Sequence, residues 1–220
     1  MPAPDPDITD LTDLASVESF LGLSSGNADE AMLQMLITGV SAEIVGYCQR
    51  DSFLARASVT ENRNGDGQDR LPFLNPPVFA VASVSLDGDL LIEASDERAA
   101  GWTFDTDYVY LRHGTPRMGG PFGISRFNRG KQNVEIVYSC GYNTPGQVKA
   151  TATVTGAPSL PNDLKLSATE LVAMRYRQSK RWGETGLSEG PIRVNYFIKA
   201  MPESVSLKLN NYKLVAPLEV

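Results

Sequence analysis

The sequence predicts an α+β fold, in which a small α-helical bundle carries a large antiparallel β insertion and extended arms at both ends. Apolar residues recur at helical spacing within residues 29–50 and again within 161–182. Between these segments the apolar period changes to two, and Asp87-Gly88 is a strong hairpin-turn signal. We therefore expect three consecutive parts. These are an arm with two helices (1–52), a β-rich insertion (53–158), and a long helix followed by a C-terminal arm and a short helix (159–220).

Two helices are predicted in the first part. Thr12 is the expected N-cap of the first helix, and Gly22 follows its last apolar residue as a C′ glycine. Asn27 is the expected cap of the second helix, because Glu30 follows it at capping-box spacing. That helix is expected to end near Arg50 and to bury Leu33, Leu36, Ile37, Val40, Ile44 and Tyr47.

The β insertion is predicted from alternating segments separated by turn residues. The candidate strands are 58–62, 79–86, 90–94, 102–105, 108–112 and 133–139. The expected sheet core consists of Phe73, Phe79, Val81, Trp102, Phe104, Val109, Leu111, Val134, Ile136 and Tyr138. Residues 114–131 are Gly-rich and basic and have no clear period, so we expect a long exposed loop there.

The last part begins after a Thr/Gly/Pro-rich connection, in which residues 149–155 could form a short strand. Pro161 suits the first turn of the long helix, and Asp163 favours its N-terminal dipole end. Its buried side is expected to carry Leu164, Ala168, Leu171 and Val172. A strand is predicted at 192–198, Pro202 opens the last helix, and the half-apolar tail 213–220 has no evident partner within the chain.

The bulk composition excludes several classes of protein. The chain of 220 residues has a net charge of −6, which argues against a dedicated nucleic-acid binder. No apolar run is long enough to span a bilayer, and the acidic, Pro-rich start is not a secretory signal. The two cysteines, Cys48 and Cys140, are expected to be reduced and buried, as in a cytoplasmic protein, although the sequence does not exclude a disulfide between them.

Catalytic and metal-binding patterns are weak. His113 is the only histidine, and no serine lies in a G-x-S-x-G elbow, so we expect no enzyme. A zinc site would need more histidine or cysteine than the chain holds. The turn 62–67 resembles the start of a calcium loop, but Phe73 stands where a bidentate glutamate is required. We therefore expect no metal and no cofactor.

Basic residues gather at two places. Arg117, Arg126, Arg129 and Lys131 lie in the Gly-rich segment, which either stays solvated or becomes ordered on contact with a neighbouring copy or DNA phosphates. Arg177 and Arg181 lie at the end of the long helix. They could pair with acidic residues of a neighbouring copy's N-terminal run, which is expected to be a solvated arm and holds Asp5, Asp7, Asp10 and Asp13.

Taken in order, these elements resemble the bacteriophage head–tail connector (adaptor) family. The resemblance rests first on Leu11-Thr12-Asp13-Leu14 and the helix that ends near Arg50, and then on residues 61–65, 71–78 and 84–88. It continues with Val134-Glu135-Ile136-Val137-Tyr138, Gly141-Tyr142, residues 160–164 and 168–176, and ends with Met201-Pro202 before the last helix. The chain differs from the shortest members of that family by its β insertion and its longer C-terminal part.

The resemblance implies a structural role in the neck of a phage or phage-like gene transfer particle. Such proteins form a ring, usually of twelve copies, below the portal protein. The ring extends the DNA channel and offers a platform for the next neck or tail protein, a stopper or tail terminator, while DNA passes without sequence-specific binding. The chain would then be made in the host cytoplasm and reside in the virion, with no membrane contact. The segment expected to contact the portal contains Pro202, Val205, Leu209, Tyr212, Leu214 and Val215.

Two other functions remain open from the sequence. One is a different neck or tail component, such as a stopper or a tail-completion protein, although the long helices argue against a mostly β stopper. The other is a carbohydrate-binding module, in which Trp102, Tyr108 and Tyr110 would form a sugar platform. Aromatic residues that alternate in a strand more often belong to a core or to cross-strand pairs.

Overall fold

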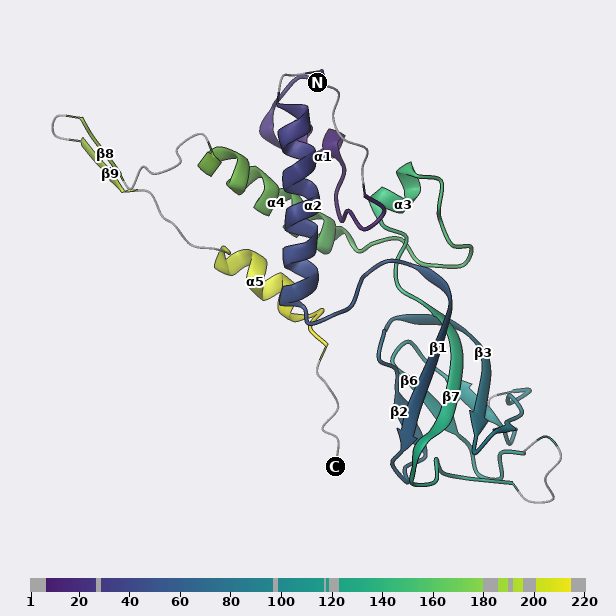
Figure 1. Cartoon of the computed structure of the whole chain (residues 1–220). Coiled ribbons are helices and arrows are strands. Elements are labelled where there is room, and N and C mark those ends of the chain that lie inside the picture. Colours follow the sequence, from purple (N-terminus) through teal and green to yellow (C-terminus); the bar gives the residue numbers. More distant parts are fainter. Residues whose placement is uncertain are drawn as a thin grey trace. The chain divides into compact units, whose positions relative to one another are not determined.

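The computed structural model confirms the α+β class and divides the chain into two compact units (Figure 1). The helical unit comprises Met1–Asp51, Thr144–Ala152 and Leu160–Leu214. The β unit comprises Ser52–Asn143, Thr153–Ser159 and Val215–Val220. The structure describes residues 7–26, 29–96, 99–116, 118, 123–179, 186–189, 192–195 and 201–214.

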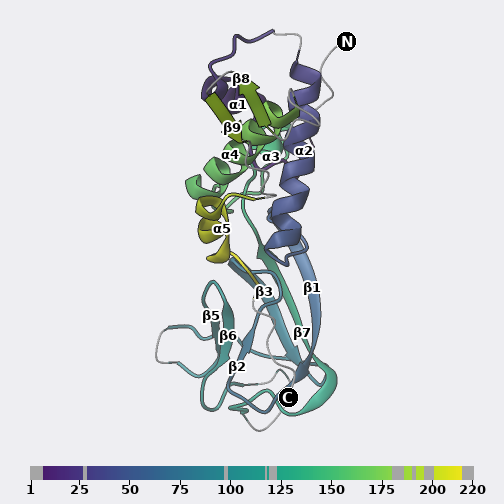
Figure 2. The same ribbon diagram turned by 90° about the vertical axis from the view of Figure 1, so that its left-hand side faces the viewer.

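The helical unit is organised around α4. Its helices are α1 (Leu14–Leu21), α2 (Glu30–Tyr47), α3 (Pro145–Lys149), α4 (Asn162–Ser179) and α5 (Glu203–Asn210). Helix α4 contacts α1, α2 and α5, as Figure 2 shows from a second side. The apolar residues that fill the space between these helices are Val17, Leu33, Ile37, Val40, Ile44, Leu164, Ala168, Leu171, Val172, Val205 and Leu209. The predicted buried sides of the second helix and the long helix are thus largely confirmed, although Leu36 and Tyr47 are only half-buried.

The start of α1 differs from the prediction by one residue. Asp13, not Thr12, is the N-cap, and its carboxylate accepts a hydrogen bond from the Ser16 amide at 2.8 Å. The Thr12 hydroxyl is instead 2.8 Å from the Thr169 hydroxyl of α4, which ties the two helices together. Gly22 adopts a left-handed conformation with φ of 70° and ends α1, as predicted.

Helix α2 begins at Glu30, with Asp29 in the N-cap position. The predicted cap Asn27 lies outside the described residues. The Glu30 carboxylate does turn back toward the preceding turn and accepts a hydrogen bond from the Gly26 amide at 2.5 Å. The helix ends at Tyr47, three residues before the predicted end.

The β unit holds two small sheets. The four-stranded sheet has the order β1-β7-β3-β4, with all neighbours antiparallel, and the three-stranded sheet has the order β2-β6-β5. The strands are β1 (Arg56–Gly65), β2 (Arg70–Pro72), β3 (Val78–Leu86), β4 (Asp89–Leu90), β5 (Trp102–Phe104), β6 (Tyr108–Leu111) and β7 (Gly130–Cys140). Buried residues of both sheets form one core, which includes Leu71, Val84, Leu86, Trp102, Val109, Leu111, Val134, Ile136 and Tyr138.

Strand β3 shows why alternation alone did not locate every core residue. Its buried residues are Val78, Val84 and Leu86, whereas the predicted core residues Phe79 and Val81 are only half-buried. The pairing of β3 with β7 has register shifts between Val78 and Ala80 and between Val81 and Ser83. A bulge of this kind changes the face on which the following side chains lie.

The Gly-rich segment 114–131 is less of a loop than predicted. Thr115 pairs with Ile124, and Phe127 is fully buried in the β core. Strand β7 already begins at Gly130, three residues before the predicted start. This segment is therefore partly ordered by the chain itself.

One further prediction was wrong near the end of the insertion. Residues 145–149 form helix α3, where a short strand had been expected at 149–155. Thr144 caps α3 through a complete capping box with Gln147, with Pro145 in the first turn, and this motif was overlooked in the sequence. Strand β7 ends before Gly141, whose φ is 92°, and a Cβ there would lie 2.2 Å from the Leu54 carbonyl oxygen.

Strands β8 (Gly186–Glu189) and β9 (Ile192–Asn195) pair only with each other among the described strands. The predicted strand 192–198 thus includes β9, while residues 196–198 lie outside the described residues. Strand β8 was not predicted.

Candidate assembly surfaces

The C-terminal segment of the helical unit is fastened to the bundle at several points. Val205 and Leu209 of α5 are 1% and 0% exposed. The Tyr212 hydroxyl bonds the Asp163 carboxylate at 2.6 Å, and the Tyr212 carbonyl accepts from Arg50 Nε at 2.6 Å. The Leu214 amide donates to the Cys48 carbonyl at 2.9 Å. Residues 203–214 are therefore an integral part of the bundle.

This arrangement changes which of the predicted portal-binding residues can contact another protein. Val205 and Leu209 face the chain's own interior, so they are not available to another protein in the folded bundle. Pro202, Tyr212 and Leu214 are half-buried, and Val215 lies outside the described residues. Leu207, which the sequence analysis did not single out, is 61% exposed on α5. Leu207 is two residues from both Val205 and Leu209, out of phase with the buried side of α5, so the apolar pattern gave no reason to single it out.

The acidic N-terminal run is not a solvated arm over its described part. Asp10 is 1% exposed, and its carboxylate accepts from Gln34 Nε2 of α2 at 2.7 Å. Asp13 caps α1 and forms an ion pair with Lys165 at 2.7 Å. Asp7 is exposed, and Asp5 lies outside the described residues. Asp10 and Asp13 thus already serve in the chain's own fold, which weakens their proposed pairing with a neighbour.

The two carboxyl groups have opposite pKa shifts. Burial raises the pKa of Asp10 above its usual value, although hydrogen bonds from neighbouring residues such as Gln34 oppose the shift. Burial also acts to raise the pKa of Asp13, but the Lys165 ammonium and the Ser16 hydrogen bonds outweigh it and lower the pKa.

The predicted basic residues are distributed over both units. Arg126, Arg129 and Lys131 are exposed in the β unit, where Gly130 pairs with Gly65 and Arg129 Nε donates to the Asp66 carbonyl at 3.3 Å. The structure thus brings these three side chains to the end of β1. Arg177 is exposed in the last turn of α4, in the helical unit. Arg117 and Arg181 lie outside the described residues.

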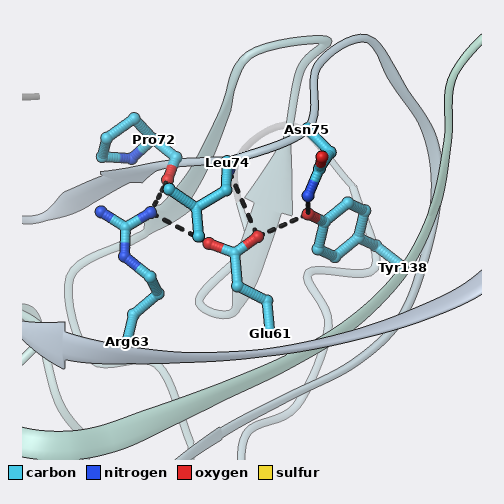
Figure 3. Close-up of polar contacts among 6 residues, drawn as sticks. All are labelled: Glu61, Arg63, Pro72, Leu74, Asn75 and Tyr138. Carbon is cyan, nitrogen blue, oxygen red and sulfur yellow. Dashed lines mark hydrogen bonds and ion pairs between the residues drawn. The ribbon is translucent and has the colours of Figure 1, made fainter. Parts of the chain in front are cut away.

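A buried polar network in the β unit was missed by the sequence analysis (Figure 3). Glu61 of β1 is 5% exposed and pairs with Arg63 Nη1 at 2.9 Å. The Tyr138 hydroxyl of β7 donates to the other Glu61 oxygen at 2.5 Å. Burial and the neighbouring Glu61 carboxylate raise the pKa of Tyr138, which keeps the hydroxyl protonated as a donor. In the sequence, Glu61 and Arg63 follow Val59 at alternate positions of β1, so all three side chains lie on the same, inward face of the sheet. This alternation was the signal for the network.

The network holds the connection between β2 and β3. The Leu74 amide donates to Glu61 at 3.2 Å, the Pro72 carbonyl accepts from Arg63 at 3.0 Å, and Asn75 Nδ2 donates to the Tyr138 hydroxyl at 3.3 Å (Figure 3). A buried charge is tolerated when it is paired and fully hydrogen-bonded. The arrangement explains why the β2–β3 connection is held in place.

The predicted sugar platform does not form. Trp102 is 2% exposed, and its indole Nε1 donates to the Leu91 carbonyl at 3.1 Å inside the core. The Tyr108 and Tyr110 rings lie 6.0 Å apart, and the Tyr110 hydroxyl donates to Asp105 at 2.7 Å. This hydrogen bond raises the pKa of Tyr110 to about 12. Trp102 therefore cannot stack on a ligand.

His113 lies in an exposed turn, where its Nδ1 is 2.9 Å from the Ser125 hydroxyl. Among the residues that the structure describes, no group of three His, Cys, Asp or Glu side chains is arranged to hold a metal ion. Within the same residues, no helix is both long and apolar enough to traverse a bilayer. Cys48 and Cys140 are both buried free thiols, in agreement with the prediction.

Comparison with solved structures gives a likeness that extends over the whole chain. No family model matches the chain, and no curated protein sequence matches it. Among solved structures, the chain is similar to a chain from the neck of an empty GTA (gene transfer agent) particle, computed with C6 symmetry. The TM-score is 0.51 with 18% sequence identity, and the match covers 100% of this chain and 99% of the other. The fold is therefore that of a protein found in a particle neck.

Proposed function

We propose that this chain is a structural subunit of the neck of a phage-like particle and, within the neck, a head–tail adaptor. In this role, copies of the chain form a ring below the portal protein, extend the DNA channel and carry the next neck or tail protein. The chain has no catalytic role, needs no cofactor, is made in the host cytoplasm and resides in the virion.

The observation that carries the proposal is the extent of the fold likeness to the neck chain. It spans 100% of this chain, so it includes the helical unit and the β unit rather than one common module. The sequence resemblance to the adaptor family adds support, because its motifs lie in both units. A ring of twelve copies is compatible with the C6 symmetry applied to the similar particle, since twelve is a multiple of six.

The charge of the chain agrees with a channel that DNA passes through. A net charge of −6 disfavours tight binding to phosphates. The exposed Arg126, Arg129, Lys131 and Arg177 would provide either limited contact with DNA or contact with a neighbouring copy. The proposed portal contact is the outer surface of α5 together with the residues that follow Leu214, including Val215, and not the buried Val205 and Leu209.

Electron microscopy of the full chain mixed with the portal protein of its particle tests this function. The expected result is a ring on the outer side of the portal, directly in contact with it. A ring located one layer further away would instead support the stopper or tail-completion role. A chain that neither forms rings nor binds portal or neck under any condition overturns the proposal.

A further inference from the structure

The β unit exposes an apolar patch at one edge of its four-stranded sheet. Leu90, Ile92 and Met118 are 40%, 45% and 62% exposed. Single exposed apolar residues are ordinary, but adjacent ones on an otherwise polar surface mark an interaction site.

Backbone hydrogen bonds place them side by side. The Met118 amide donates to the Leu90 carbonyl at 2.8 Å, and the Ile92 amide donates to the Pro116 carbonyl at 3.1 Å. This antiparallel pattern sets Met118 opposite Leu90 and Pro116 opposite Ile92. Leu91, between them, is buried and bonds Val84 of β3, so Leu90 and Ile92 lie on the other, outer face.

The surroundings of this apolar edge are polar and acidic. Across the sheet from Leu90, the outer face carries Ser85, Glu135 and Asn62, which are successive register partners. Asp87, Asp89 and Glu93 are exposed next to the patch. Among the described residues, the apolar edge, defined by Leu90, Ile92 and Met118, thus has an acidic border.

The end of β1 in the same sheet carries the opposite charge. The strand order β1-β7-β3-β4 puts β1 and β4 at the two edges. Arg126, Arg129 and Lys131 are exposed at the end of β1, where the Gly67 amide bonds the Phe127 carbonyl. These three residues form a basic patch at the end of β1 and the start of β7, here called the basic edge, which is distinct from the apolar edge of Leu90, Ile92 and Met118.

We propose that the apolar edge of one copy of this chain docks on the basic edge of the next copy around a ring. A head-to-tail contact joins two different patches and closes into a ring, whereas a two-fold contact would bring the acidic borders together. Apolar contact supplies the burial, and the charges set the direction of the contact. The inference rests on the proposed ring function and assigns the β unit as a contact between copies.

Two reversal variants test the direction of this contact. The first carries Asp89→Lys and Glu93→Lys, and the second carries Arg126→Glu and Arg129→Glu. Each variant alone is expected to self-associate at least tenfold more weakly than the wild type, because like charges meet at every contact. An equimolar mixture is expected to recover assembly, since every contact in a ring of alternating copies again joins opposite charges.

A third variant tests the apolar contribution. Ile92→Ser with Met118→Ser is expected to weaken self-association at least tenfold, whereas Leu74→Ser, at a site 40% exposed in the same unit, serves as the matched control and is expected to have no effect. Assembly of the full chain is measured by mass photometry and negative-stain imaging, with and without the portal. Circular dichroism melting verifies that each variant is folded.

The outcomes separate this inference from the proposed function. If the wild type forms rings and all variants form the same rings, the inference is wrong and the adaptor role is unaffected. Failure of the mixture to recover assembly also overturns it. A wild-type chain that neither self-associates nor joins the portal overturns both.

Discussion

The Tyr212 hydroxyl lies 2.6 and 2.7 Å from the two carboxylate oxygens of Asp163. This contact joins the segment after α5 to the first turn of α4. Asp163 also accepts from the Leu164 amide at 3.0 Å, and the helix dipole favours a carboxylate at this end. The end of the described chain is thus fixed by a charge-assisted bond.

Tyr212→Phe removes this bond while keeping the ring. Because the acceptor is charged and the site is half-buried, the free energy of unfolding of the helical unit should fall by about 1.5 kcal/mol. Urea denaturation measures the change, and hydrogen exchange should show faster exchange in residues 203–214. Tyr110→Phe is the control, because its hydroxyl also donates to a carboxylate, at an exposed site. Equal unfolding of Tyr212→Phe and the wild type would show that the bond contributes nothing.

The Glu61–Arg63 pair should behave as a coupled unit. Glu61→Leu leaves a guanidinium that is only 14% exposed without its carboxylate, so about 3 kcal/mol of stability should be lost. Arg63→Met should cost a similar amount for the converse reason. The double variant should lose less than the sum of the two. Fluorescence of the buried Trp102, in a Trp182→Phe background, follows unfolding of the β unit. Additive losses would contradict the coupling.

The opposite pKa shifts of Asp10 and Asp13 predict opposite pH effects. The pKa of Asp10 is raised in the folded state, so its contribution is most favourable below the unfolded value and is lost as pH rises through the folded pKa. The pKa of Asp13 is lowered, so its contribution is present above the unfolded value and is lost as pH falls through the folded pKa.

Asp10→Asn should therefore gain stability relative to the wild type as pH rises, and Asp13→Asn should lose it. Urea denaturation at steps from about pH 3 to about pH 7 gives the two differences. The two variants serve as controls for each other, because Asp10 and Asp13 lie in the same segment and their shifts are opposite. Two differences with the same slope would be inconsistent with this account.

The limits of sequence reading can be traced to particular residues. The buried faces of α2 and α4 were predictable, because apolar residues recur at helical spacing over 18 residues in each helix. Phe79 was misplaced because the bulges in β3 depend on its pairing with β7, which local alternation does not encode, whereas Val81 is half-buried and does pack against the core. Glu61 could not be distinguished from an ordinary charged strand residue in the sequence, because its burial depends on the contacts with Arg63 and Tyr138 that the fold creates.

The candidate surfaces were harder to predict than the core. Arg126, Arg129 and Lys131 were identified from composition alone, but their gathering at the end of β1 depends on the pairing of Gly65 with Gly130. Leu90 and Met118 are 28 positions apart in the sequence, so only the backbone bond between them shows that they are neighbours. Val205 and Leu209 were assigned to the portal contact from the family resemblance, and the helix that α5 packs against, α4, lies far away in the sequence.

The reactivity of the Cys48 thiol indicates whether residues 203–214 are packed against the helical bundle. Burial raises the pKa of Cys48 to about 11, and its Sγ lies 3.7 Å from the Leu209 carbonyl oxygen. Reaction with a disulfide reagent at neutral pH should therefore be very slow in the native protein. Deletion of residues 215–220 should leave Cys48 protected, since the bonds of Tyr212 and Leu214 remain.

Deletion of residues 211–220 should instead speed the reaction of Cys48 at least tenfold, because the bonds that Tyr212 and Leu214 make to Asp163, Arg50 and Cys48 are lost. Cys140 is the internal control, because it is buried in the β unit and should stay protected in both truncations. Peptide mapping of the labelled protein distinguishes the two thiols. If Cys48 is equally protected after both deletions, the contacts of α5 itself, which include buried Val205 and Leu209 and the Lys208–Glu170 ion pair, are enough to hold it, and the residues after it do not secure the segment.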